Sequence, residues 1–165
     1  MNALQKVTTQ YSEIEDRIRI TGDAGGNHSI SFWLSQRLLT RLLMKLFEWL
    51  ERHSTNSTSE ITQSFAQDAA KASLSPEKAV EPTGNFRDWL VVSIDITAQA
   101  NTLSLIFKGD SEQSTTISFN ELQLRQWLEI LHSLWKLAQW PDTSWPDWFI
   151  RKESFTDSNS LQSMH

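Results

Sequence analysis

Apolar residues follow two successive spacings in the first third of the chain. Over residues 13–21 they alternate with polar residues, a period of two that predicts a half-buried strand. The glycine- and asparagine-containing segment 22–27 predicts a turn, and 28–33 predicts a second strand. Over 34–53 the spacing changes to three and four, which predicts an amphipathic helix.

The same order of patterns returns after residue 86. Apolar and β-branched residues predict three strands, at 89–96, 102–108 and 114–119. The beginning of the next helix has clear local signals, because Asn120 is a favourable N-cap and Gln123 stands where a capping box needs it. Pro141 predicts that this helix stops after Trp140.

The two regions align when the chain is shifted against itself. A shift of 87 positions places Gly22-Asp23 on Gly109-Asp110 and Ile30-Ser31-Phe32 on Ile117-Ser118-Phe119, and a shift of 88 aligns the two helix faces. A ββα plan in each half, whether or not it is a true duplication, predicts an α+β protein. We expect one antiparallel sheet of about five strands with two long amphipathic helices on one face, the alternative being a split arrangement of facing halves.

Composition divides the chain further without adding a second domain, since 165 residues suit one domain. Ser, Thr, Gln, Ala and Glu predominate between the two regions, which predicts a flexible linker with at most a weak helix. The predicted segments are a first ββα unit (11–53), the linker (54–85), a second βββα unit (86–140), a Trp-Pro strap (141–150) and a disordered tail (151–165).

Charge and composition narrow the classes of function. With 15 Lys and Arg against 20 Asp and Glu, the net charge of −5 argues against a protein that mainly binds phosphate backbones. Cysteine is absent, which excludes disulfides and thiolate chemistry. The first residues lack a signal-like apolar run, and charges interrupt the apolar stretch 34–50. We therefore expect a cytoplasmic protein without a membrane partner.

Residues capable of chemistry are present but scattered. The imidazoles of His28, His53, His132 and His165 show no metal-ligand spacing, and no nucleophile elbow or phosphate loop occurs. The paired carboxylates are those of strand faces and exposed turns. We expect no enzyme, no cofactor and no metal.

Two features indicate binding instead. A basic stripe lies on the first helix and is either a solvated face or a site for an acidic partner; its residues are Arg37, Arg41, Lys45 and Arg52. The stripe has no interleaved aromatic residues, which argues against nucleic acid.

The second feature is the repeated Trp-Pro-Asp strap, with Trp140, Trp145, Trp148 and Phe149. The strap either closes the core of its own domain or presents a binding surface. We expect a non-enzymatic protein-interaction module, such as an adaptor, assembly factor or small regulatory subunit, that binds another protein or itself. The alternatives are a nucleic-acid-associated protein using the basic helix face and a carrier or enzyme with a Trp-lined pocket.

Overall fold

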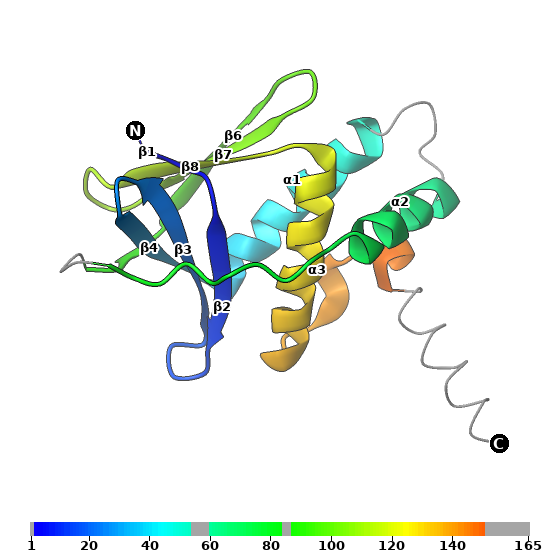
Figure 1. Ribbon diagram of the computed structural model, residues 1–165. Helices are drawn as coiled ribbons and strands as arrows, with labels where there is room; N and C mark the ends of the chain where they lie inside the picture. Colours follow the sequence, from blue (N-terminus) through cyan, green and yellow to red (C-terminus); the bar gives the residue numbers. More distant parts are fainter. Residues whose placement is uncertain (1, 54–59, 84–86, 151–165) are drawn as a thin grey trace.

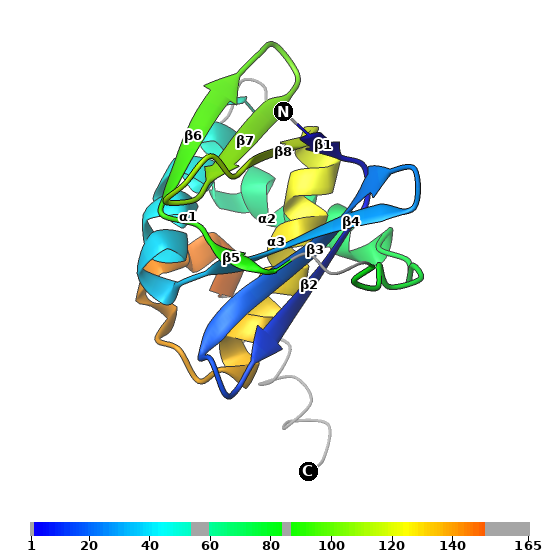
Figure 2. The ribbon, with the colours of Figure 1, turned by 90° about the vertical axis from the view of Figure 1, so that its left-hand side faces the viewer.

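A computed structural model describes residues 2–53, 60–83 and 87–150. Within these residues the protein is α+β, with two mixed four-stranded sheets and their covering helices (Figure 1). Seen from the side, the strands lie at the front of the molecule and the helices behind them (Figure 2). The predicted disordered tail, 151–165, lies outside the described residues.

Each half of the chain contributes four strands and a long helix. The first half contains β1 (Asn2–Leu4), β2 (Val7–Ser12), β3 (Arg17–Gly25), β4 (His28–Leu34) and α1 (Gln36–His53). After α2 (Glu60–Ala72), the second half contains β5 (Trp89–Leu90), β6 (Ser93–Ala98), β7 (Leu103–Lys108), β8 (Ser114–Phe119), α3 (Glu121–Leu137) and a short 3₁₀ turn, η1 (Asp142–Ser144).

The halves exchange their first strands. The sheet orders are β1-β8-β7-β6 and β2-β3-β4-β5. β1 pairs in parallel with β8, and β5 pairs in parallel with β4, whereas the other neighbours are antiparallel. The expected single antiparallel sheet is therefore replaced by two mixed sheets. The predicted strand 89–96 is two strands in different sheets, because the chain crosses between the sheets at Val91 and Val92.

Strand pairing gives the true register between the halves. Ile18 and Ile20 lie opposite Leu34 and Phe32, just as Leu103 and Leu105, 85 positions later, lie opposite Phe119 and Ile117. The buried residues of α1 at positions 39, 42, 43, 46 and 50 recur at the same shift as Leu124, Trp127, Leu128, Leu131 and Trp135. The shift of 87, taken from residue identities, and the shift of 88, taken from the helix faces, differ from this register by two and three residues. Such errors leave a residue on nearly the same face of a strand or helix.

The first predicted hairpin is displaced along the chain. Residues 13–16 form the turn between β2 and β3, where Asp16 has a φ of 50° and Ile14 is 97% exposed. Gly22 lies inside β3 rather than in a turn, and the turn to β4 is made where Gly25, Gly26 and Asn27 have positive φ. Exposed Ile14 had extended the apparent alternation, so the strand was predicted four residues too early.

Both long helices begin at a capping side chain one residue after a strand. Ser35 Oγ accepts from the Leu38 N–H, and Asn120 Oδ1 accepts from the Gln123 N–H at 2.8 Å. The Gln123 side chain accepts in turn from the Asn120 N–H, which confirms the predicted capping box. α3 ends at Leu137, before the predicted Trp140, because Gln139 adopts a φ of 60° and turns the chain back.

α2 occupies part of the segment predicted as a flexible linker and packs on α3. Its buried positions are Gln63, Gln67 and Ala70, whereas Ile61 and Phe65 are exposed. The pattern of α2 thus differs from that of an ordinary amphipathic helix, which explains why composition predicted only a weak one. Residues 54–59 and 84–86 lie outside the described residues, and the flexibility of the linker stays a prediction.

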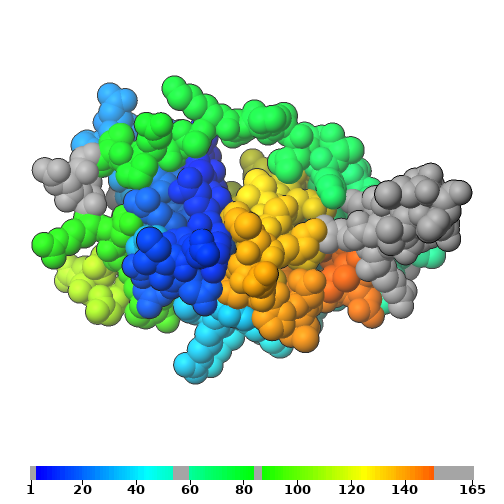
Figure 3. Space-filling model, turned by 90° about the horizontal axis from the view of Figure 1, so that it is seen from below, coloured from blue at the N-terminus to red at the C-terminus, as the bar shows by residue number. Residues whose placement is uncertain are grey.

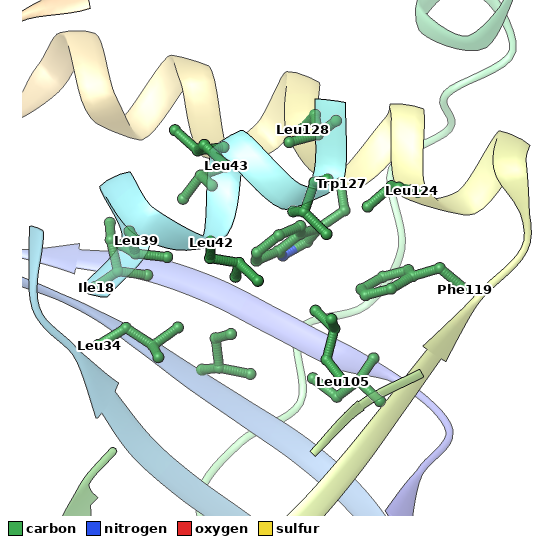
Figure 4. Close-up of a cluster of buried hydrophobic side chains, with 14 of the residues drawn as sticks. Ile18, Leu34, Leu39, Leu42, Leu43, Leu105, Phe119, Leu124, Trp127 and Leu128 are labelled. Carbon is green, nitrogen blue, oxygen red and sulfur yellow. The ribbon is translucent and has the colours of Figure 1, made fainter. Parts of the chain in front are cut away.

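One core lies between the helices and both sheets. Ile18 and Leu34 from one sheet and Leu105 and Phe119 from the other point toward side chains of α1 and α3 (Figure 4). The apolar faces of the two long helices contribute Leu42, Leu43, Leu46, Leu128 and Leu131, which are buried, and Leu134, which packs half-buried against the core. Trp127 reaches from α3 toward the sheets (Figure 4).

Candidate functional site

An open groove of about 900 Å³ lies between α1 and β6 and is here called the α1/β6 groove. β6 is the outer strand of its sheet (Figure 2). Its Ile94, Ile96 and Ala98 lie opposite the buried apolar residues of β7, so they face the inner side of the sheet. The lining from α1 comprises Leu38, Arg41, Leu42, Lys45, Glu48, Trp49 and Arg52, and that from the second half comprises Val92–Ile96, Ala98 and Leu103.

The floor of the α1/β6 groove is apolar and incompletely covered. Ile96 of β6 is 37% exposed although it faces the inner side of the sheet, and Val92, just before β6, is 52% exposed. Apolar surface gathered in a concave site favours association with another apolar surface. The outer strand of a sheet also offers unpaired backbone groups that can accept a further strand.

The rim of the groove is cationic on the side of α1. Arg52 lies 2.8 Å from Glu48, and Lys45 lies 4.0 Å from the same carboxylate. Across the groove, Asp95 is paired with Lys108. Arg41 makes no ion pair within the described part of the chain. Glu48 therefore shares one negative charge between two cations, and the groove side of α1 keeps a net positive charge.

The structure places the aromatic strap residues in the core. Trp140, Trp145, Trp148 and Phe149 are at most 8% exposed. The rings of Trp145, Trp148 and Phe149 surround Phe47 of α1 with centroid distances between 5.6 and 6.1 Å. The strap thus covers α1 at the side facing α3, which favours its role in closing the domain.

A hydrogen-bonded latch fixes the start of the strap. Trp140 Nε1 donates to Asp16 Oδ1 at 2.9 Å, and the Tyr11 hydroxyl donates to the same oxygen at 2.7 Å. The β2–β3 turn and the strap are side by side in the view from below (Figure 3). The two hydrogen bonds, that from Tyr11 first, lower the pKa of Asp16, and the bond to Asp16 raises the pKa of Tyr11.

A buried polar network joins α2 to α3. Arg125 is 2% exposed and donates to Gln63 Oε1 at 2.6 Å and to Glu121 Oε1 at 3.0 Å. Gln67 Nε2 donates to the Arg125 carbonyl and to Glu129 Oε1. Burial lowers the pKa of Arg125, and the Glu121 carboxylate acts in the opposite direction. The network positions a helix and lies away from the α1/β6 groove.

Two further sites contain residues with possible chemistry. His132, 1% exposed, lies 3.3 Å from Asp142 and packs against the rings of Trp145 and Phe149, so it is a core residue rather than a surface one. A second cavity of about 560 Å³ lies beside the β3–β4 turn, with His28, Trp89 and Glu112 in its lining.

The sequence identified one side of the groove and missed the other. Arg41 and Lys45 line the α1/β6 groove, whereas Arg37 is exposed on α1 and is outside its lining. The missed residues are those of β6, since the β propensity of residues 89–96 predicts a strand but not its place in a sheet. The one sequence signal for an open groove was the short side chains of Ser93 and Ala98 at the two ends of β6. Short side chains leave the neighbouring apolar surface uncovered.

Comparisons of the chain with protein-family models, curated proteins and solved structures found no match. Across residues 2–53, 60–83 and 87–150, no three metal-ligating side chains cluster. No helix in those same ranges is long and apolar enough to cross a bilayer.

Proposed function

We propose that the protein is a non-enzymatic interaction module that binds an extended acidic segment of another protein in the α1/β6 groove. The observation that carries the proposal is the open apolar groove beside an outer strand, with a cationic helix as its opposite wall. An adaptor, assembly factor or small regulatory subunit would use such a site.

The outer strand decides how the partner lies. A segment that pairs with β6 extends the sheet through backbone hydrogen bonds, and its alternate side chains point into the groove. There they cover Ile94 and Ile96, which the chain leaves partly exposed. Main-chain pairing supplies affinity, and the side-chain positions supply specificity.

The charge of α1 decides which segment is favoured. Acidic residues of the partner would lie against Arg41 and Lys45, whose positive charge α1 does not neutralise on its own. Complementary charge raises the association rate and suppresses wrong partners. Nucleic acid is the weaker candidate because the cations border an apolar groove rather than a row of exposed aromatic side chains.

A peptide library displayed on phage tests this function. Selection on the wild-type protein should enrich peptides in which every second residue, on the face toward the groove, is apolar or acidic. Their affinity should fall about tenfold or more for the Arg41→Glu/Lys45→Glu variant, because like charges then face each other. Lys6→Glu/Lys71→Glu makes the same change in charge at two exposed positions outside the groove and is the matched control.

The other outcomes are equally informative. Peptides that bind both double variants as tightly as wild type would place binding outside the groove and overturn the proposal. An oligonucleotide bound only by the wild type and the control would support the nucleic-acid alternative. Concentration-dependent dimers in sedimentation that Arg41→Glu/Lys45→Glu abolishes would assign the groove to a second copy of this chain.

A further inference from the structure

The pairing of the halves reveals what the α1/β6 groove lacks. Thr9 of β2 lies opposite Ile20, and Ile96 of β6 lies opposite Leu105, the counterpart of Ile20 in the second half. Thr9 and Ile96 are therefore equivalent. By the same pairing Tyr11, opposite Ile18, is equivalent to Ala98, opposite Leu103.

Aromatic rings fill this space in the first half. Trp127 of α3, 4% exposed, donates through Nε1 to Thr9 Oγ1 at 3.0 Å. Trp140 meets Tyr11 edge to face, with ring centroids 5.7 Å apart. The inner side of β2 is thus covered by rings from α3 and the segment that follows it.

The equivalent positions of the second half have smaller side chains without rings. Leu42 of α1, 85 positions before Trp127, replaces the indole, and Ala98 replaces the tyrosine ring. Both line the α1/β6 groove, which is open where the other half is filled. Ile96, the equivalent of Thr9, is consequently 37% exposed.

We propose that the partner segment supplies the missing ring, as one aromatic anchor residue seated between Leu42 and Ile96. This inference rests on the proposed binding function and specifies the chemistry of its ligand. Phenylalanine suits the site better than tryptophan, because Ile96 lacks the hydroxyl that accepts the indole N–H of Trp127 at Thr9. Acidic residues two positions before or after the anchor, on the same face of the added strand, meet Arg41 and Lys45.

The peptides selected on the groove are the probe for this anchor. Groove-dependent peptides should share one aromatic position, and replacing it with alanine should weaken binding by about 30-fold or more, as for a buried anchor. Replacing a neighbouring acidic residue with alanine should have a smaller effect. Acidic, groove-dependent peptides without an aromatic position would overturn the anchor and leave the proposed function standing.

A filled groove provides the complementary test on the protein. Ala98→Tyr restores the ring that the first half has at Tyr11, and its exposed position makes the variant compatible with folding. Binding of the peptides should be lost, with an unchanged thermal midpoint. Thr97→Tyr places the same ring on the opposite face of β6, outside the groove lining, and should bind normally. Equal binding by both tyrosine variants would refute the anchor site, whereas failure to select any groove-dependent peptide would refute the proposed function itself.

Discussion

Asp16 is the residue whose charge ties the β2–β3 turn to the strap. Because two hydrogen bonds to its carboxylate lower its folded pKa below the usual 3.8, the stabilisation is present at neutral pH and is lost as the pH falls through the folded pKa. We predict that Asp16→Asn lowers stability at neutral pH and that the difference from wild type disappears in acid. Urea unfolding at several pH values measures this.

Asparagine tolerates the positive φ of position 16, so the comparison isolates the charge. Glu15→Gln is the control, because Glu15 is a neighbouring exposed carboxylate, 3.9 Å from Arg17. Its free energy of unfolding should differ little from that of the wild type at either pH. An Asp16→Asn difference that persisted unchanged at acid pH would show that the ionised form is not what the latch requires.

Gly22 matters for its small size rather than for a turn. A Cβ at this position would collide with the side chain of Leu4, which belongs to the other sheet. We predict that Gly22→Ala destabilises the protein by about 1–3 kcal/mol through overpacking, measured by denaturant unfolding. Leu4→Ala removes the obstructing side chain, so the double variant should be no less stable than Leu4→Ala alone. Strictly additive losses would contradict this explanation.

Arg125 is the link through which α2 is held on α3. Arg125→Leu removes the donor to Gln63 and Glu121, and a lost hydrogen bond to a charged group costs about 1.5–3 kcal/mol. We predict that amide hydrogen exchange accelerates in α2 well before α1 or the sheets, as in local unfolding. Arg41→Leu makes the same chemical change at an exposed site, and its stability should change by only about 0.5 kcal/mol. Equal acceleration in both variants would show that Arg125 does not anchor α2.

Helices and strands with regularly spaced apolar residues or a local capping signal were predictable from sequence. The helix after Asn120 and the strand 114–119 are confirmed because capping and alternation are properties of adjacent residues. β1 could not be found this way, and β5 could not be separated from β6, since they are three and two residues long and their partners are distant in sequence. α2 was predicted weakly because its buried side consists of glutamines, which bind Arg125 and the backbone rather than an apolar surface.

The candidate site was half predictable for the same reason. The spacing of α1 indicates which of its residues face away from the core, and Arg41 and Lys45 follow from that spacing. Which strand lies beside them depends on how the halves exchange strands. The likeness of the two halves could reveal the groove only once the shift of 85 was known, and that shift comes from strand pairing rather than from residue identities.

The exchange of strands makes the two halves depend on each other as a whole molecule. β5 completes the sheet of the first half, and β1 completes that of the second. The strap of the second half covers Phe47 of α1, and Trp127 of α3 covers β2. Each half alone would therefore expose core surface on its sheet and on its long helix, and a domain that small buries too little apolar area to compensate.

We predict that fragments 1–56 and 57–165 are each unfolded alone and assemble into a one-to-one complex when mixed. The break falls between α1 and α2 and cuts neither helix. Near-ultraviolet circular dichroism should show native tryptophan signals only in the mixture, and sedimentation should give the mass of the intact chain. A first fragment that begins at residue 7 lacks β1 and its parallel pairing to β8, so it should assemble more weakly. Cooperative unfolding of either fragment by itself would mean that the halves are independent units, and that the exchanged strands add little to the stability of the fold.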